Sequence, residues 1–372
     1  MIVLLKRIAV FAVVFCFFIG GFKTQGLGVS AKSAILMDGI SGRVIYCANE
    51  KQRLSMASTT KIMTALLLCE NGEFDKEITI TPEMVRTEGS SMGLSVGMKL
   101  THRDLLYGML LTSGNDAANA TAVSIGGSIE DFVAMMNKKA EELGLSDTHF
   151  DTPSGLDGDT HYTTAYDLVM LTRYALTNED FSEVCQTKSI TLNYGGTSHT
   201  LTNHNRLLFS YEGAVGVKTG FTKKSGRCLV SAARRDNALL IAVTLNDGND
   251  WQDHKSMLDY GFTFISDNPV LFEKENYNVS VLGGDKESVA AKCEEISFRT
   301  HKESTITKKE YVYPFVYAPI QKGDTVGYIE YYSGDFLVVS QEIIAEENVN
   351  AVLPPTFWQR VKVSFCMLFK LI

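Results

Sequence analysis

The stretch Ser58-Thr59-Thr60-Lys61-Ile62-Met63-Thr64-Ala65-Leu66-Leu67-Leu68 joins a polar start to an uninterrupted apolar run. The run is free of glycine and proline, and it predicts a helix over residues 62–68. Residues three apart lie on one helical face, so the Lys61 amine can reach the Ser58 hydroxyl. A neutral amine can take the serine proton if burial or a neighbouring cation lowers the pKa of Lys61. The start of the helix also offers backbone N–H groups to a developing oxyanion.

A Ser-x-x-Lys pattern is weak evidence when it stands alone. In a chain of 372 residues, about one or two such patterns arise by chance. The plain alternative is a serine that caps a helix, followed by a solvated lysine. Other motifs must decide between the two interpretations.

Two more polar motifs follow along the chain. Ser113-Gly114-Asn115 separates apolar segments that predict helices over residues 105–111 and 116–123. Its hydroxyl and amide can relay a proton and hold a substrate amide, although an ordinary turn with an N-cap has the same composition. Lys218-Thr219-Gly220 begins a strand-like stretch. A cation, a hydroxyl and a glycine suit a carboxylate-ended substrate along a strand edge, and the plain alternative is a turn at the end of a strand.

Strand-like and helix-like segments alternate from residue 33 to residue 264. Short apolar runs predict strands at both ends of this segment, over residues 34–37, 43–46, 228–233 and 239–245. Between them, Thr164 and Asp167 predict a capping box that opens a helix. A further helix is predicted over residues 253–260. This order predicts one α/β domain whose sheet uses both ends of the segment.

The remaining chain differs in composition from this domain. After about residue 267, β-type runs such as residues 311–317 predict a small all-β domain that extends to about residue 349. At the N-terminus, an apolar run over residues 8–19 follows two basic residues, as in a secretory signal; an uncleaved anchor is the alternative. Residues 356–372 follow Pro354-Pro355 and carry apolar side chains on one helical face. This favours an interfacial membrane helix over a helix packed on the protein.

Charge and the metal-binding residue types narrow the functional classes. The chain holds 35 Lys and Arg against 43 Asp and Glu, a net charge of -8 that argues against a nucleic-acid partner. Its seven cysteines and seven histidines are scattered, with neither a Cys-x-x-Cys nor a His-Glu-x-x-His motif. We therefore expect no metal and no cofactor.

The three motifs occur in the order Ser-x-x-Lys, Ser-x-Asn, Lys-Thr-Gly, which is the signature of penicillin-binding proteins and class A β-lactamases. The chain resembles the low-molecular-weight serine-type D-alanyl-D-alanine carboxypeptidases, the penicillin-binding-protein-5-like family. The resemblance covers nearly the whole chain. Besides the three motifs, it rests on Ala34-Ile35-Leu36-Met37-Asp38, Asn203-His204-Asn205 and Phe221-Thr222. It implies an α/β (α+β) catalytic domain of the serine β-lactamase/transpeptidase type, with an antiparallel sheet and a helical cluster, plus a small all-β C-terminal domain.

The resemblance implies a catalytic role for three residues. Ser58 attacks the carbonyl between the two terminal D-alanines of a peptidoglycan stem peptide and forms an acyl-enzyme. Lys61 acts as its general base, and Ser113 passes the proton toward the leaving amine. β-Lactam antibiotics mimic the dipeptide and should acylate Ser58 as inhibitors.

The resemblance also implies a substrate-binding set. Asn115 orients the substrate amide, while Lys218 and Thr219 bind the terminal carboxylate. Gly220 allows close approach of the backbone, and the N–H groups of Ser58 and Phe221 form the oxyanion hole.

One feature departs from the family pattern. Some members carry a carboxylate-binding arginine near the loop after the last strand, but here Asn246-Asp247-Gly248-Asn249-Asp250-Trp251 contains none. Carboxylate recognition then depends on Lys218 and Thr219, or on Lys223 and Lys224, which fit a solvated turn equally well.

Two other functions compete with the carboxypeptidase. A class A-like β-lactamase deacylates through a glutamate, but residues 150–166 lack a Glu-x-x-Leu-Asn match, and the chain has an additional β domain. A non-catalytic module that binds peptidoglycan or senses β-lactams would not need every motif side chain. The β domain itself can serve to set the height of the active site above the membrane, or to bind a partner.

The predicted organisation has four parts: a signal peptide (1–31), the penicillin-binding catalytic domain (32–266), a β-sandwich-like domain (267–349) and an amphipathic anchoring helix (350–372). Together they predict an exported protein on the outer face of the bacterial cytoplasmic membrane, bound to the membrane surface through its C-terminal helix.

Overall fold

The computed structural model describes residues 27–352. The apolar run of the predicted signal peptide and residues 353–372 of the predicted anchoring helix lie outside the described residues. Within residues 27–352, no helix is long and apolar enough to cross a membrane.

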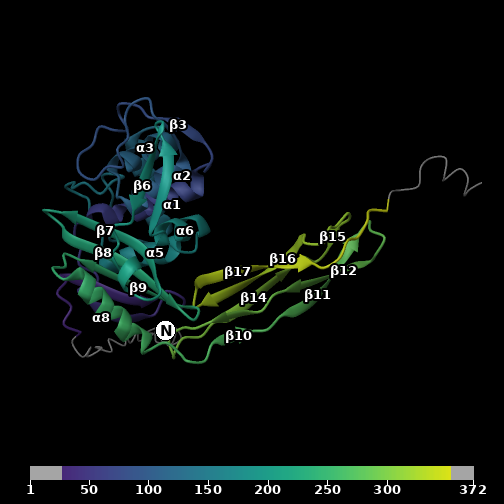
Figure 1. Cartoon of the computed structure of the whole chain (residues 1–372). Helices are drawn as coiled ribbons and strands as arrows, with labels where there is room; N and C mark the ends of the chain where they lie inside the picture. The colour runs from purple at the N-terminus through teal and green to yellow at the C-terminus, as the bar shows by residue number, and fades with distance from the viewer. Residues whose placement is uncertain (1–26, 353–372) are drawn as a thin grey trace, which may run out of the picture.

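A five-stranded antiparallel sheet forms the centre of the first domain (Figure 1). Its strands, in the order β2-β1-β9-β8-β7, are β2 (Val44–Ala48), β1 (Ser33–Asp38), β9 (Ala238–Leu245), β8 (Gly226–Arg235) and β7 (Ala214–Thr222). Ile35 of β1 lies opposite Val243 of β9, so the two ends of the segment meet. This confirms the sheet predicted from the sequence, and it leaves β7 as an edge strand.

Both faces of this sheet are covered by helices. Successive side chains of a strand point to opposite faces: Ile35 packs into the main core on the helical-cluster side, while Leu36 packs with Met257 of α8 (Asp250–Phe262). The helical cluster contains η1 (Ala57–Thr60), α1 (Lys61–Asn71), α2 (His102–Leu111), α3 (Asn115–Gly126), α4 (Ile129–Glu142), α5 (Ala165–Ala175), α6 (Glu179–Gln186) and α7 (Leu207–Ser210). Two small hairpins, β3 (Glu77–Thr79) with β4 (Lys99–Thr101) and β5 (Ser189–Tyr194) with β6 (Thr197–Thr202), complete the domain.

The helix predicted at Thr164 begins there, but its capping box is only half formed. The Thr164 hydroxyl accepts the Asp167 N–H at 3.0 Å. The Asp167 carboxylate instead accepts from Asp147 N and Thr148 Oγ1, because the loop before the helix offers it these donors. The capping prediction is therefore correct for the threonine and wrong for the aspartate.

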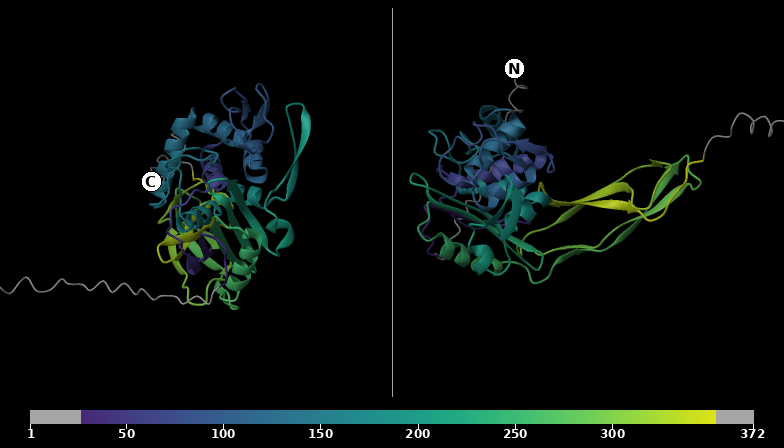
Figure 2. Two further views of the ribbon diagram at one scale, coloured as in Figure 1. Left: turned by 90° about the vertical axis from the view of Figure 1, so that its left-hand side faces the viewer. Right: turned by 45° about the horizontal axis from the view of Figure 1, so that its top comes forward.

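The second domain is all-β and projects away from the first as an elongated sheet (Figures 1 and 2). Its six-stranded sheet has the order β14 (Thr307–Val312), β16 (Thr325–Ser333), β17 (Phe336–Ala345), β12 (Ser288–Cys293), β11 (Glu275–Leu282), β15 (Val316–Tyr317). β10 (Val270–Phe272) and β13 (Ile296–Phe298) form a separate two-stranded sheet, which packs against Tyr331 of β16.

The β-type run predicted over residues 311–317 is divided between two strands. Proline lacks the N–H that a ladder needs, and Pro314 lies between the end of β14 and the start of β15. The chain then crosses to the other edge of the sheet, where Val316 pairs with Val281 of β11.

Buried polar groups join the two domains. The Asp38 carboxylate at the end of β1 accepts from His301 N at 2.8 Å and from the Thr300 hydroxyl. Arg173 of α5 donates to the carbonyl of Gly39 at 2.8 Å, and its guanidinium stacks 3.2 Å from the ring centroid of Phe336 in β17. Because these groups are directional, they fix the β domain against the catalytic domain.

Residues just before β1 also belong to the fold. Leu27, Val29 and Ala31 pack against the core between the sheet and α8. The backbone N–H of Ser30 donates to Asp253 at 2.6 Å, and its hydroxyl donates to Asp247 at 2.8 Å. Cleavage after Ala31, the boundary expected from the sequence, would remove all of these contacts.

Candidate active site

The three sequence motifs converge on one cavity of about 670 Å³ beside the edge strand β7. Ser58, Ser113, Thr219, Gly220 and Phe221 line it. The remaining motif side chains, those of Lys61, Asn115 and Lys218, are buried. Sequence positions separated by more than a hundred residues therefore form one site.

Ser58 lies in the 3₁₀ turn η1 that leads into α1. The residue before it, Ala57, has a φ of 48°, a conformation that costs free energy for a residue with a Cβ atom. Two hydroxyls hold this turn: Thr59 donates to Met56 O at 2.7 Å, and Thr60 donates to Ala57 O at 2.8 Å. The strained turn presents the Ser58 hydroxyl to the cavity.

Lys61 is fully buried directly behind Ser58. Its Nζ lies 2.9 Å from Ser58 Oγ, 2.7 Å from Asn115 Oδ1 and 2.6 Å from the carbonyl oxygen of Ser154. Burial, and then the charge of Lys218, hold the pKa of Lys61 well below its usual range. These are the two causes that the sequence analysis required for a basic amine.

The three partners of Lys61 suit a neutral amine. An –NH₂ group has two N–H donors and one lone pair. Asn115 and Ser154 each present an oxygen that can only accept, so they take both N–H groups. The lone pair is then left for the hydroxyl proton of Ser58.

The second motif holds Lys61 and the loop that covers it. The side-chain amide of Asn115 donates to Glu88 O at 2.6 Å while its oxygen accepts from Lys61. The neighbouring Asp116, which sequence reasoning missed, accepts from Met92 N and Leu94 N at 2.9 and 3.0 Å. Residues 88–94 are thereby tied to the start of α3. Ser113 lines the cavity with a φ of 61°, and within residues 27–352 its hydroxyl has no hydrogen bond to Ser58 or Lys61.

Lys218 lies under the cavity rather than in it. Its side chain is 1% exposed, and its Nζ donates to the carbonyl of Thr219 at 2.9 Å. Burial lowers the pKa of Lys218 to about 7. At neutral pH this amine is therefore charged only part of the time.

Gly220 brings the edge strand close to Ser58. A Cβ atom at this position would lie 3.0 Å from Ser58 N and 3.1 Å from Thr59 N. Only glycine leaves the Ser58 N–H open to a ligand at this point. The next residue, Phe221, is 66% exposed at the mouth of the cavity.

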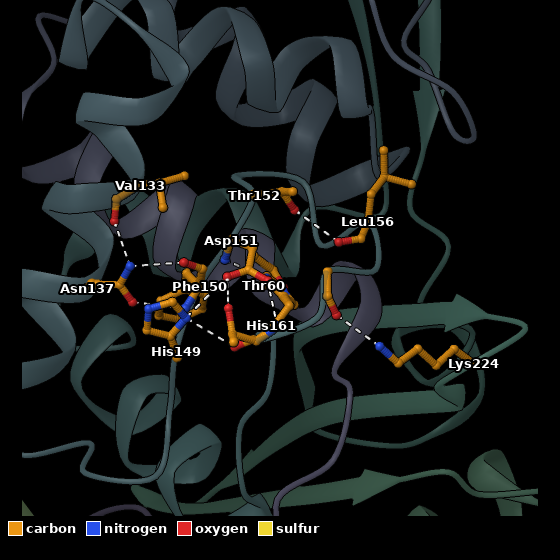
Figure 3. A network of polar contacts seen from close by, with 12 residues as sticks. Thr60, Val133, Asn137, His149, Phe150, Asp151, Thr152, Leu156, His161 and Lys224 are labelled. Atoms are coloured by element: carbon orange, nitrogen blue, oxygen red, sulfur yellow. Dashed lines mark hydrogen bonds and ion pairs between the residues drawn. The ribbon is translucent and has the colours of Figure 1, made fainter.

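Next to Thr60 of η1, a polar network holds the loop of residues 149–161 (Figure 3). His161 Nδ1 accepts the Asp151 N–H at 2.9 Å, and its Nε2 lies 2.8 Å from Thr60 Oγ1. Burial lowers the pKa of His161 to about 4, so the ring is neutral with its proton on Nε2, donated to Thr60. Lys224 closes the other side of the loop by donating to Gly158 O at 2.9 Å.

The same loop supplies the Ser154 carbonyl to Lys61. Gly155 follows with a φ of +86°, and a Cβ atom there would lie 2.0 Å from Ala57 O. The loop therefore packs directly on the strained turn of η1. Sequence reasoning matched residues 153–156 to the family but missed the roles of Ser154 and His161. Ser154 acts through its backbone carbonyl, and the partners of the His161 ring lie elsewhere in the chain.

Several residues at the cavity were given no role from the sequence, and among them are Arg206, Arg227, Asp250 and Trp251. The loop after β9 contributes no cation, but its Asp250 pairs with Arg227 of β8 through contacts of 2.6 and 3.0 Å. Lys223 and Lys224, the alternative cations considered above, are not among the residues that line the cavity.

Comparison with protein families gives two matches, one for each domain. The profile of the family described as D-alanyl-D-alanine carboxypeptidase matches residues 21–249. The profile described as the C-terminal domain of penicillin-binding protein 5 matches residues 263–351.

Individual proteins are similar over most of their length. The D-alanyl-D-alanine carboxypeptidase DacF of Bacillus subtilis is 34% identical over 358 residues, covering 91% of this chain and 91% of the relative. DacC of Escherichia coli is 32% identical over 343 residues, covering 86% and 84%. Among solved structures, the D-alanyl-D-alanine carboxypeptidase DacD of Francisella tularensis has a TM-score of 0.62 at 28% identity, covering 87% of this chain and 94% of that one.

Proposed function

Because this chain belongs to the D-alanyl-D-alanine carboxypeptidase family of penicillin-binding proteins, we propose that Ser58 is the nucleophile of its peptidase reaction. The chain is a serine-type carboxypeptidase that removes the terminal D-alanine from peptidoglycan stem peptides. The observation that carries the proposal is the 2.9 Å contact between Ser58 Oγ and Lys61 Nζ, whose pKa is strongly lowered. A base within hydrogen-bond reach of the hydroxyl is the first requirement for nucleophilic catalysis.

Acylation begins with transfer of the Ser58 proton to the lone pair of Lys61. Ser58 Oγ then attacks the carbonyl of the penultimate D-alanine, and the negative charge develops on the carbonyl oxygen. The N–H groups of Ser58 and Phe221 stabilise this oxyanion, on the two sides of the gap that Gly220 keeps open.

Collapse of the tetrahedral intermediate requires a proton on the leaving amine. Lys61 now carries that proton, and Ser113 on the cavity wall relays it to the departing D-alanine. Water then attacks the acyl-enzyme, again with Lys61 as the base, and releases the shortened peptide. Each turnover therefore consumes one water molecule and hydrolyses one peptide bond.

The substrate backbone binds along the outer edge of β7, whose other edge pairs with β8. Asn115 holds Lys61 and orients the substrate amide, while Thr219 and Lys218 lie next to the terminal carboxylate. A β-lactam presents a strained amide and a carboxylate in the same arrangement, and it acylates Ser58 without rapid release.

The β-lactamase alternative is less well supported. In that class a glutamate activates the deacylating water. In the described part of the chain, the hydrogen-bond partners of Lys61 are a hydroxyl, an amide oxygen and a backbone carbonyl, with no carboxylate among them. We expect long-lived rather than rapidly hydrolysed penicillin adducts.

The direct test is release of D-alanine from a peptide that ends in Lys-D-Ala-D-Ala. We expect release by the wild-type protein and none by Ser58→Ala, which also loses covalent labelling by penicillin. Covalent labelling of the wild-type protein by penicillin without any release of D-alanine would refute the carboxypeptidase assignment. It would instead support a β-lactam-sensing module.

We also propose export and attachment to the outer face of the cytoplasmic membrane through an amphipathic C-terminal helix. Supporting this are the signal-like run over residues 8–19 and the one-sided apolar pattern over residues 356–372. The described chain ends at the end of the β domain that is remote from the catalytic domain (Figure 2), where Val352 N donates to Gly283 O at 2.8 Å. Attachment there would hold the cavity above the membrane surface. Near this end, Phe315 and Tyr317 are exposed, as interfacial aromatic residues are.

A further inference from the structure

None of the motif residues offers the terminal carboxylate of the substrate a side chain that is both accessible and always positively charged. Lys218 is buried, its Nζ is engaged by the Thr219 carbonyl, and its pKa is about 7. Lys224 is also engaged, by Gly158 O on the loop behind the site. The following inference rests on the proposed function, since it concerns the recognition of a peptide that ends in a carboxylate.

Arg227 reaches the cavity from β8, where it pairs directly with Phe221 of β7. Asp250, which is 4% exposed at the start of α8, accepts from its Nε at 3.0 Å and from its Nη2 at 2.6 Å. This bidentate pair fixes the plane of the guanidinium and leaves Nη1 free to donate. The side chain of Arg227 remains 44% exposed, so a ligand in the cavity can reach it.

Arg206 is the residue before α7, and it also lines the cavity. It is exposed and forms no ion pair within residues 27–352. Its guanidinium carbon lies 5.9 Å from the Trp251 ring centroid, and that of Arg227 lies 5.7 Å from it. The buried indole Nε1 of Trp251 also finds no acceptor in the described chain.

These four side chains carry a net positive charge. One of the two guanidinium charges is balanced by Asp250, and the other is not. We propose that Arg206 and Arg227, which both lie beside Trp251, bind the terminal carboxylate of the substrate near Thr219. Arg227 supplies a fixed donor, and Arg206 supplies the uncompensated charge. Arginine suits this task because its planar fork matches a carboxylate and stays charged at every working pH.

The assignment explains why the loop of residues 246–251 can lack an arginine. The cation comes from the adjacent strand β8, and the loop region contributes the carboxylate that holds it in place. The loop sequence alone cannot reveal this replacement of a loop arginine by Arg227, because Arg227 and Asp250 are 23 positions apart.

The experiment compares ligands that differ only in the carboxylate. The rate of Ser58 acylation is measured by intact-protein mass spectrometry with benzylpenicillin and with its methyl ester. In Arg206→Ala/Arg227→Ala we expect acylation by the acid to slow about 100-fold and acylation by the ester to change less than about 3-fold, since each charge-assisted contact contributes roughly tenfold or more. Each single variant should give part of this loss.

Arg235→Ala is the matched control. Arg235 also lies on β8 and also faces an aspartate of α8, Asp259 at 3.9 Å, but it is not among the residues that line the cavity. We expect its acylation rates to equal those of the wild type. If Arg227→Ala fails to fold with Asp250 unpaired, Arg227→Gln with Asp250→Asn removes both charges and keeps a hydrogen-bonding pair.

Equal slowing with acid and ester, or no slowing with either, would overturn the assignment. So would a selective loss produced by Lys223→Ala instead of by the arginine variants. The outcome is separable from that of the proposed function. An enzyme that releases no D-alanine refutes the carboxypeptidase reaction, whereas the acid-to-ester comparison reads the carboxylate site whether or not turnover occurs.

Discussion

At the scale of single residues, the proposed reaction depends on the protonation state of Lys61. Burial holds the pKa of Lys61 well below its usual range, and two of its Nζ contacts are acceptors that can take both N–H groups of a neutral amine. A residue that stays protonated cannot perform this step, whatever its length or position.

Lys61→Arg tests that requirement. A guanidinium keeps a positive charge at all working pH values, so it cannot accept the Ser58 proton. We expect acylation of Ser58 by penicillin to slow by about three orders of magnitude, in the range typical of loss of a general base. The check is a stopped-flow or quenched acylation time course on folded protein. An acylation rate within tenfold of wild type would contradict the role given to Lys61.

Gly220 gives a second prediction at this scale. In Gly220→Ala the new methyl group lies 3.0 Å from Ser58 N and obstructs the oxyanion site. We expect kcat/KM for D-alanine release to fall about 100-fold, as for loss of one oxyanion donor. Gly248→Ala is the control, because a Cβ atom there meets nothing within 4 Å. Equal activities in the two variants would argue against the proposed oxyanion site.

At the scale of elements, the predictable features were those with a local signal. The apolar runs of β1, β8 and β9 predicted the sheet, and its edge placed Lys218-Thr219-Gly220 beside Ser58. The hairpin of β5 and β6 was missed although its signal is local: Ser189–Tyr194 alternates polar and apolar residues, and Gly195-Gly196 joins the two strands. The supporting roles of His161 and Asp250 could not be predicted from the sequence, because their partners lie on other elements.

The loop of residues 149–161 should make stability depend on pH. His161 is neutral in the fold with a pKa of about 4, below the ordinary 6.5 that it regains on unfolding. The unfolded chain therefore binds more protons between these values, and stability falls as pH falls from 6.5 to 4. We expect His161 to account for about 2 to 3 kcal/mol of the loss between pH 7 and pH 4.5.

His161→Gln is the variant that isolates this contribution. It keeps a donor for Thr60 but does not titrate, so urea unfolding at pH 7 and pH 4.5 should differ by about 2 to 3 kcal/mol less than in the wild type. His254, buried between Ser231 and Thr244 with a pKa of about 3, acts in the same direction and remains in both proteins. An unchanged pH dependence in the variant would refute this account of His161.

At the scale of the whole molecule, the active-site cavity and the proposed point of membrane attachment lie at opposite ends. The polar junction of Asp38, Arg173 and His301 fixes the β domain to the catalytic domain, and the chain continues beyond residue 352 from the remote end. The sequence predicted an all-β second domain from its composition. It could not predict the junction, because Asp38 and His301 are 263 positions apart.

Deletion of residues 356–372 tests this separation. We expect the shortened protein to lose binding to vesicles that contain anionic lipid, because the one-sided apolar face and its basic residues are removed. D-Alanine release from a soluble peptide should stay within about twofold of wild type, since each domain keeps its own core. Vesicle sedimentation and the release assay give the two readouts. Retained vesicle binding would place the membrane contact elsewhere in the chain.

The central claim is that the reaction passes through an acyl group on Ser58. Its most direct test is rapid quenching of the wild-type enzyme with a Lys-D-Ala-D-Ala peptide, followed by mass mapping of the modified residue. We expect an adduct that has lost one D-alanine, attached to Ser58 and absent in Ser58→Ala, together with free D-alanine. An adduct on another residue, or D-alanine release that survives in Ser58→Ala, would contradict it.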